Sequence, residues 1–453
     1  MDDTQRYDAI VIGAGQGGGP LAGAFAKAGL RTLLVERTHI GGTCINKGCT
    51  PTKTMIASGR VAYLARRGKD FGVHTGEITI DLARVRERKR VIVDEFRTGS
   101  EQALAKAGVE VEFGHARFTA PHTIEIESAG GERTTASADI IVINTGMRPL
   151  VPNIPGLADA SYLDSTSIME LDTVPEHLIV LGGGYVGLEF AQLFRRFGSH
   201  VTVVHRGDQL LPHEDPDIAA AIADILREDG IDIRLDTNTT AIHQADGTIE
   251  LSADIRGSHL LVATGRTPNT DDLGADAAGI ELDDKGCIKA NARLETTAKG
   301  VYVVGDVKGG PAFTHVSYDD FRILRANLLR DGNASTEGRV LPYTVFIDPQ
   351  LGRVGMTEKE ARAAGFDVRI ARMPMNNVAR ALEMDEPRGT MKAVVDRNTN
   401  LILGAAILGI DGGEVAAMLQ LAMIGSLPFT ALRDGMFSHP TLSESLNNLF
   451  GSI

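Results

Sequence analysis

The sequence has little of several residue types, and these shortages narrow the class of protein. It contains no tryptophan and only three cysteines in 453 residues. No apolar run reaches the roughly 20 residues that a membrane-spanning helix needs. Acidic residues outnumber basic ones, and the net charge of −13 argues against nucleic acid or an anionic membrane as the main partner. With 51 glycines and 43% hydrophobic residues, the chain is typical of a soluble α/β enzyme of two to four domains.

The first eight residues are acidic and polar and run directly into a strand pattern, unlike a signal or transit peptide. We therefore expect a cytoplasmic protein, in which a disulfide is more often catalytic than structural. Cys287 is far from the other two cysteines in the sequence, and we interpret it as a residue without a redox role. The other two cysteines lie close together, and that clustering needs a chemical reason.

Cys44 and Cys49 are five positions apart in the segment 41–53, which reads Gly-Gly-Thr-Cys-Ile-Asn-Lys-Gly-Cys-Thr-Pro-Thr-Lys. In a regular helix, residues at this spacing have Cα atoms about 8.6 Å apart. A relaxed disulfide needs roughly 4.4–6.8 Å. The backbone between the two cysteines must therefore be irregular when they are bridged, and Gly48 can supply an unusual φ.

Pro51 fits an early turn of the helix that follows, which would place Cys49 near a helix N-terminus, where the dipole favours a thiolate. The positive charges of Lys47 and Lys53 act in the same direction. Two buried, inert cysteines or half of a zinc site are the alternatives. The four-residue spacer, without a second Cys/His cluster downstream, disfavours zinc. We interpret the pair as redox-active.

A dinucleotide-binding pattern begins at the apolar run 9–12, which is typical of a buried parallel strand and is followed by a glycine turn and a helical pattern to about residue 28. The glycines of the turn are Gly13, Gly15 and Gly18. A second strand, 32–35, ends in Glu36. Glycines at this spacing let the backbone approach a pyrophosphate at the helix N-terminus, and the acid can receive ribose hydroxyls.

A second copy of this pattern follows a domain boundary at the proline-rich segment 151–156. It has a strand at 178–181, a helix to about residue 197 and a strand at 201–204. Its glycines are Gly182, Gly184 and Gly187. The first and second copies end in segments of similar sequence, 143–149 and 260–268. Two such sites in one chain suggest that electrons pass between two bound dinucleotides.

The second copy ends in His205 and Arg206 where the first has Glu36. An acid there would repel a 2′-phosphate, whereas Arg206 could pair with one, so the sequence favours NADPH over NADH. An exposed arginine without a ligand is the alternative. Gly187, a residue type often seen with NAD at this position, weakens the case for NADPH.

The rest of the chain predicts helices at 57–66 and 82–107, half-exposed antiparallel strands at 109–113 and 123–127, and buried strands at 140–143 and 301–304. Further strands are expected at 344–347, 390–395 and 402–407. The helix expected at 414–424 is too apolar for a solvent face, which indicates an interface.

The segment 41–53 resembles the redox-active disulfide motif of the flavoprotein disulfide reductases (class I pyridine nucleotide-disulfide oxidoreductases), and the resemblance covers essentially the whole chain. It implies an α/β fold with two Rossmann-like dinucleotide-binding domains and a C-terminal α+β dimerisation domain in a homodimer. The implied domains are an FAD-binding domain at 1–150 that returns at 269–338, an NAD(P)H-binding domain at 151–268 and the dimerisation domain at 339–453.

The resemblance also implies roles for single residues. Cys49 would contact the flavin and Cys44 would meet the substrate, while His439 and Glu444 would act as an acid/base pair at the other subunit's active site. Lys53 would lie beside the flavin and pair with Glu189. The expected cofactor-binding residues are Gly13, Gly15, Gly18, Glu36, Thr43, Lys53, Thr145, Gly146 and Asp306 for FAD, and Gly182, Gly184, Gly187, His205, Arg206 and Gly265 for NADPH.

The tail leaves two further points open. The segment 441–444, Thr-Leu-Ser-Glu, also matches a capping box at a helix start, which by itself would explain Glu444. The bond between His439 and Pro440 is a candidate for a cis peptide.

Within the family, the segments 313–322, 341–346, 353–358 and 439–450 look most like the mercuric-reductase-like subgroup that includes the reactive-chlorine-resistance flavin reductase. The resemblance implies reduction of Hg(II), Cu(II) or a small disulfide, with no resident metal site. An NAD-dependent dihydrolipoyl dehydrogenase is the alternative, although that enzyme normally has an acid where this chain has His205. A redox-sensing binding protein without turnover is a third possibility, disfavoured because all the redox residues are retained.

Overall fold

The structure is a computed structural model that describes residues 4–453. Its contacts divide the chain into two compact units. Of the described residues, the first consists of 4–54, Arg84–Leu150 and Gly265–Arg339, and the second of Met55–Ala83, Val151–Thr264 and Val340–Ile453. Among the described residues, no helix has the length and apolar character that crossing a membrane requires.

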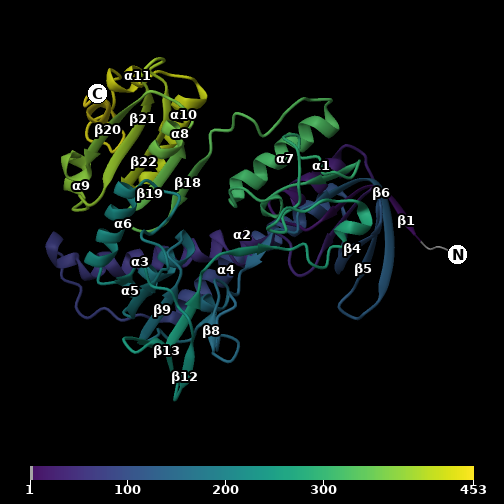
Figure 1. The fold of residues 1–453 in the computed structure, drawn as a ribbon, viewed down its shortest axis with the longest axis horizontal. Coiled ribbons are helices and arrows are strands. Elements are labelled where there is room, and N and C mark those ends of the chain that lie inside the picture. Colours follow the sequence, from purple (N-terminus) through teal and green to yellow (C-terminus); the bar gives the residue numbers. More distant parts are fainter. Residues whose placement is uncertain (1–3) are drawn as a thin grey trace. The chain divides into compact units, whose positions relative to one another are not determined.

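The first unit is built on a seven-stranded sheet in the order β3–β2–β1–β6–β5–β4, with β17 paired to β6. Figure 1 labels its strands β1, β4, β5 and β6. Its strands are β1 (Gln5–Ile12), β2 (Thr32–Glu36), β3 (Glu110–Phe113), β4 (His115–Ala120), β5 (Thr123–Glu127), β6 (Arg133–Ile143) and β17 (Val301–Val303). Strands β3, β2, β1, β6 and β17 pair in parallel, whereas β4, β5 and the start of β6 pair antiparallel. A short ribbon joins β7 (Met147–Pro149) to β16 (Arg266–Pro268).

Alternate residues of the central strand β1 face the two sides of this sheet, and both sides are buried. Ala9 and Val11 pack in one cluster with apolar residues of α1 (Gly18–Lys27) and α7 (Thr314–Leu329). Ile10 and Ile12 pack in a second cluster on the opposite side. This burial on both faces explains why the last four residues of β1, 9–12, form a continuous apolar run.

The prediction of an antiparallel strand at 109–113 is wrong, because β3 pairs in parallel with β2. β3 lies at the edge of the sheet, and its apolar residues Val111 and Phe113 are 37% and 51% exposed, so the alternation in its sequence does not tell the direction of pairing. The antiparallel prediction for β5 is confirmed.

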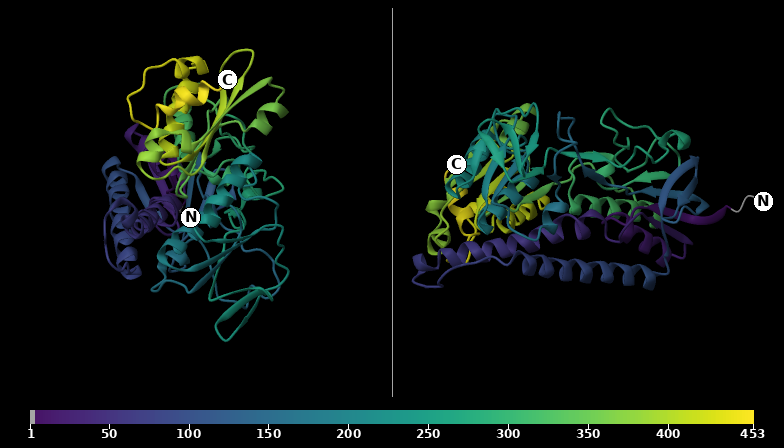
Figure 2. Two further views of the ribbon diagram at one scale, coloured as in Figure 1. Left: turned by 90° about the vertical axis from the view of Figure 1, so that its left-hand side faces the viewer. Right: turned by 90° about the horizontal axis from the view of Figure 1, so that it is seen from below.

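The remaining helices that carry part of this unit are α2 (Gly42–Asn46), α3 (Cys49–Arg66) and α4 (Leu82–Ala107). Figure 2 shows the unbroken course of α4.

The second unit contains a parallel five-stranded sheet in the order β11–β10–β9–β15–β8 and a separate antiparallel sheet β12–β13–β14. The strands are β8 (Tyr162–Leu163), β9 (His177–Leu181), β10 (His200–Val204), β11 (Asp232–Arg234), β12 (His243–Ala245), β13 (Thr248–Ser252), β14 (Ile255–Gly257) and β15 (His259–Val262). Helix α5 (Tyr185–Phe197) connects β9 to β10, and α6 (Pro216–Glu228) connects β10 to β11. This repeats the strand–turn–helix–strand order of the first unit, as the two glycine patterns predict.

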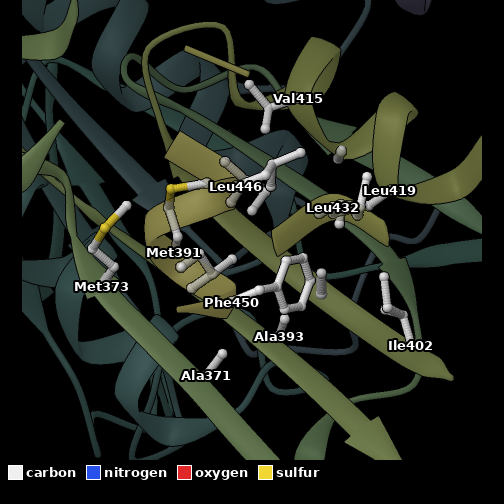
Figure 3. Close-up of a cluster of buried hydrophobic side chains, with 14 of the residues drawn as sticks. Ala371, Met373, Met391, Ala393, Ile402, Val415, Leu419, Leu432, Leu446 and Phe450 are labelled. Atoms are coloured by element: carbon white, nitrogen blue, oxygen red, sulfur yellow. The ribbon is translucent and has the colours of Figure 1, made fainter. Parts of the chain in front are cut away.

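The C-terminal part of the second unit is an antiparallel sheet in the order β18–β19–β22–β21–β20 with helices packed on it. Its elements are β18 (Pro342–Val345), β19 (Gln350–Gly355), α8 (Glu358–Ala363), β20 (Val368–Pro374), α9 (Ala379–Glu383), β21 (Thr390–Asp396), β22 (Ile402–Gly409), α10 (Gly412–Ile424), α11 (Phe429–Arg433) and α12 (Ser445–Phe450). Figure 3 shows the core, in which Met391 and Ala393 of the sheet lie close to Leu446 and Phe450 of α12. This core fixes the last helix and the loop that precedes it.

Candidate active site

Cys44 and Cys49 lie together because the helical backbone is interrupted between them. Cys44 is in α2, which ends at Asn46, and Cys49 is the first residue of α3. Cys49 is near enough to Cys44 to raise the pKa of the Cys44 thiol, and the Cys49 sulfur lies 3.5 Å from the Thr314 hydroxyl oxygen at the start of α7. Neither thiol is bridged. The pair can close into a disulfide by losing two electrons and two protons.

Gly48 does not provide the unusual φ that the sequence suggested. The left-handed glycines here are Gly41, with φ 100°, and Gly42, with φ 62°, at the start of α2. A Cβ on Gly48 would lie 3.0 Å from the Thr43 carbonyl oxygen. Glycine therefore suits this position because the backbone at Thr43 passes close to it. The helix stops at Lys47, whose φ is −140°.

The two thiols differ in their surroundings. The neighbouring Cys49 and burial of the side chain both raise the pKa of Cys44, while Thr314 and the charge of Lys53 act to lower it. Cys49 is exposed and occupies the N-terminal end of the 18-residue helix α3, where backbone N–H groups favour negative charge. In the dithiol form, Cys49 is therefore the natural site of the thiolate and Cys44 of the protonated thiol.

The first glycine turn forms a tight cradle at the end of β1. A Cβ on Gly13 would lie 2.4 Å from the Asn144 carbonyl oxygen, and one on Gly18 would lie 2.2 Å from the Gly13 carbonyl oxygen. Glu36 ends β2, and its carboxylate accepts hydrogen bonds from the N–H groups of Ala14 and Thr38, both at 2.9 Å. Each carboxylate oxygen can still accept from a ribose hydroxyl.

Asn144 is a residue of this site that the sequence analysis did not assign. Its Oδ1 accepts from the Gly18 N–H at 2.9 Å, and its Nδ2 donates to the Val304 carbonyl at 3.0 Å. The residue is only 8% exposed. It thus ties the glycine turn to the ends of β6 and β17. Its position directly before Thr145 and Gly146, at the end of a buried strand, was the available signal.

Asp306 follows β17, as predicted. Burial raises the pKa of its carboxyl, while Arg266 and Lys308 act to lower it. Asp320 on α7, which no sequence pattern indicated, is fully buried and accepts from the Gly305 N–H at 2.9 Å. Asp320 also pairs with Arg339 at 2.7 Å and Lys308 at 3.3 Å, which positions the turn that carries Asp306.

These residues fit a flavin dinucleotide. The cradle leaves no room for side chains where a pyrophosphate would lie, and Glu36 and Asp306 provide acceptors for hydroxyl groups. The Thr145 hydroxyl is buried and has no hydrogen-bond partner among the described residues, which suits a ligand contact. Gly146 has φ 67°, and Thr43 is exposed beside Cys44.

The second glycine turn repeats the first. A Cβ on Gly182 would lie 2.3 Å from the Ala263 carbonyl oxygen, and one on Gly187 would lie 2.6 Å from the Gly182 carbonyl oxygen. Gly184 precedes α5, and Gly265 has φ 150°. His205 is half-buried directly after β10, and Arg206 beside it is exposed.

Glu189 is 3% exposed on α5, and its carboxylate accepts from the Phe346 N–H at 2.9 Å. The pairing of Glu189 with Lys53 stays a prediction. Cys287 is 5% exposed, and burial raises the pKa of its thiol.

His439 and Glu444 lie together in the C-terminal loop before α12. His439 Nδ1 is 2.9 and 3.0 Å from the two carboxylate oxygens of Glu444. The bond between His439 and Pro440 is cis, as anticipated. Because an ionised carboxylate only accepts, Nδ1 carries the proton and Nε2 keeps a lone pair.

The capping-box interpretation of 441–444 is wrong in its main part. Thr441 accepts from the Glu444 N–H at 3.2 Å, but α12 begins only at Ser445, and the Glu444 carboxylate bonds His439. A complete capping box occurs at α8 instead, where Thr357 and Glu360 satisfy each other's backbone N–H groups.

The whole chain matches known proteins. Residues 7–320 match the family model of pyridine nucleotide-disulphide oxidoreductases, and residues 341–450 match their dimerisation domain. RclA of Escherichia coli (strain K12), named a pyridine nucleotide-disulfide oxidoreductase, is 39% identical and covers 99% of each chain. The solved Cu(II) complex of the HOCl-induced flavoprotein disulfide reductase RclA superposes with a TM-score of 0.91 at 38% identity over 99% of each chain.

Other relatives include the mercuric reductase of Bacillus cereus, 34% identical over 98% of this chain and 72% of that protein. A dihydrolipoyl dehydrogenase of Haloferax volcanii is also 34% identical, over 98% and 96% of the two chains. Family members use a flavin and a pyridine nucleotide. With its dithiol, its two dinucleotide cradles and these matches along its length, the chain belongs to the pyridine nucleotide-disulphide oxidoreductases and is an oxidoreductase of the subgroup that includes RclA and the mercuric reductases.

Proposed function

We propose that the protein passes electrons from NADPH through FAD and the Cys44–Cys49 pair to a soft metal ion, Hg(II) or Cu(II), or to a small disulfide. The observation that carries the proposal is the pair of neighbouring thiols, Cys44 in α2 and Cys49 at the start of α3. A bound flavin supplies two-electron transfer between a nicotinamide and a disulfide. The residues that would hold it are Gly13, Gly15, Gly18, Glu36, Asn144 and Asp306.

The dithiol can reduce either kind of acceptor. Closing the disulfide releases two electrons and two protons. Two Cu(II) ions each take one electron to give Cu(I), one Hg(II) takes both to give Hg(0), and a small disulfide takes both electrons and both protons to give two thiols. Soft ions favour thiolate ligands, which supports the metal as substrate. The Cu(II) complex named for RclA and the mercuric reductases among the relatives support the same choice.

His439 and Glu444 would handle the proton of Cys44. Nε2 of His439 has a lone pair to accept that proton, and the Glu444 carboxylate at 2.9 Å stabilises the imidazolium that forms. We infer that the protein is a homodimer in which the pair serves the active site of the partner subunit. Because a metal ion needs such a base less than an organic disulfide does, the pair keeps a disulfide acceptor open, whether the small disulfide proposed above or the substrate of the second candidate, a dihydrolipoyl dehydrogenase.

A panel assay separates these functions. Purified protein is given NADPH or NADH with Cu(II), Hg(II), glutathione disulfide or lipoamide. We expect NADPH with a metal ion or a small disulfide to turn over, and Cys44→Ser to lower that rate at least about 100-fold. Cys287→Ser is the matched control and should keep the wild-type rate. Rapid lipoamide reduction with NADH would instead establish the dehydrogenase, and an unaffected Cys44→Ser enzyme would exclude the dithiol.

The NADPH preference is proposed from Arg206, which is exposed at the end of the second cradle. We expect Arg206→Glu to lower kcat/KM for NADPH at least about tenfold and to leave NADH little changed, because a carboxylate repels the 2′-phosphate. Arg227→Glu, at an exposed arginine of α6, controls for the change in net charge. An enzyme that prefers NADH and ignores the Arg206 substitution would contradict the assignment.

A further inference from the structure

The two dinucleotide cradles share one hydrogen bond that is made by different side chains. In the first, Oε2 of Glu36 accepts from the Ala14 N–H at 2.9 Å. In the second, Nδ1 of His205 accepts from the Gly183 N–H at 3.2 Å. In both cases the acceptor is 22 residues beyond the donor and stands at the end of the strand that follows the helix, Glu36 as the last residue of β2 and His205 directly after β10. The imidazole of His205 therefore occupies the structural place of the carboxylate.

The ring of His205 is enclosed by backbone. A Cβ on Gly183 would lie 2.8 Å from its Cγ, and a Cβ on Gly207 would lie 3.0 Å from its Nε2. Leu211 donates from its N–H to the Gly183 carbonyl at 3.0 Å, which closes the loop against the cradle. Since Nδ1 accepts an N–H, the ring is the neutral tautomer with its proton on Nε2.

We propose that neutral His205 is a positioning residue of the second dinucleotide site: it holds the glycine turn as a carboxylate would, but without a negative charge beside a 2′-phosphate. The inference rests on the NADPH site proposed above and adds a dependence on pH. An acid at this position would supply both a hydrogen-bond acceptor for the turn and a negative charge. Neutral His205 supplies the acceptor alone.

The charges around His205 set the direction of the pH effect. Arg206 and Asp208 lie on its own loop and Asp236 follows β11, while the glycines 182–184 that face the ring carry no titratable group. Burial and then Arg206 lower the pKa of His205 from its ordinary value, and the two aspartates act to raise it. Protonation places a hydrogen on Nδ1 and removes the acceptor of the Gly183 N–H. Because the pKa is lowered, this bond is present above the ordinary histidine range and is lost as pH falls through the lowered pKa.

The test is calorimetric titration of the oxidised flavoprotein with NAD⁺ and NADP⁺, which needs no electron acceptor. For the wild type, we expect affinity for NAD⁺, which lacks the 2′-phosphate, to fall about fivefold between pH 7.5 and 5.5, the equivalent of one hydrogen bond. His205→Gln keeps an acceptor that does not titrate, so its NAD⁺ affinity should stay constant and its NADP⁺ preference should remain.

His205→Glu keeps the acceptor and adds the charge, so it should bind NAD⁺ normally and lose at least about tenfold in NADP⁺ affinity. His205→Leu should bind both more weakly at every pH. Should His205→Leu not fold, the Gln and Glu variants still separate the effect of the hydrogen bond on nucleotide affinity from the effect of the charge. A His205→Gln protein with the wild-type pH profile would overturn the inference. A wild type that prefers NAD⁺ would refute the proposed NADPH use, while the NAD⁺ profile would still test the role of His205.

Discussion

At the scale of single residues, the first dinucleotide site depends on side chains that fix its backbone as well as on those that would contact the ligand. Asn144 satisfies a buried N–H of the glycine turn and a buried carbonyl at the end of β17 with one amide group. A buried backbone group left without a partner costs about 1–3 kcal/mol. The shape of the cradle therefore depends on a residue outside the glycine motif.

We expect Asn144→Leu to lower the stability of the flavoprotein by about 2–4 kcal/mol, since it leaves the Gly18 N–H and the Val304 carbonyl unpaired. The purified variant should also contain less flavin, measured as the ratio of flavin to protein absorbance. Asn377→Leu, at an exposed asparagine, is the control and should change neither quantity. Full flavin content in the Asn144 variant would show that the glycines alone hold the turn.

At the scale of elements, the dithiol is positioned by the start of α2 as much as by the break before α3. Gly42 has φ 62°, and a Cβ there would lie 2.6 Å from the Cα of Gly15. The short helix that carries Cys44 is thereby packed directly against the first glycine turn. The motif's opening glycines link the cysteine pair to the nucleotide cradle.

Gly42→Ala should destabilise the protein by at least about 2–3 kcal/mol, because it combines a left-handed backbone with a clash against Gly15. Gly131→Ala is the matched control, since Gly131 has φ 81° but no atom within 4 Å of an added Cβ. It should lose only about 1 kcal/mol. Denaturant unfolding with flavin fluorescence measures both. Equal losses in the two variants would show that only backbone strain matters.

The sequence predicted the elements well where one local signal decides them, and less well where pairing in space decides them. The glycine turns with their strands and helices, and the helix N-terminus at Cys49, follow from glycine spacing, apolar runs and Pro51. The direction of β3 did not follow, because the same alternation arises at the edge of either kind of sheet. Asn144 and Asp320 were missed because their partners are 126 and 15 residues away, respectively.

At the scale of the whole molecule, the apolar character of α10 points to association between copies. Leu421 and Ile424 are 70% and 62% exposed, and Leu427 beyond the helix is 45% exposed. Exposed apolar side chains gathered in this way mark protein contacts. They lie in the domain that matches the family's dimerisation model.

Leu421→Glu should shift the protein from dimer to monomer in sedimentation velocity, because it places a charge in the expected interface. Leu382→Glu, at a leucine 55% exposed on α9, is the control and should remain dimeric. If His439 serves the partner's Cys44, the monomer should also lose most turnover with a small disulfide. A dimeric Leu421→Glu protein would place the interface elsewhere.

The return of β17 to the edge of β6 has a consequence for how the protein is made. The segment that completes the first cradle, with Asp306 and the carbonyl of Val304, is synthesised about 160 residues after Asn144. A ribosome must therefore produce the entire second glycine repeat before the flavin has its full set of contacts. Nascent chains released before β17 should fail to retain the cofactor, however well their N-terminal strands have formed.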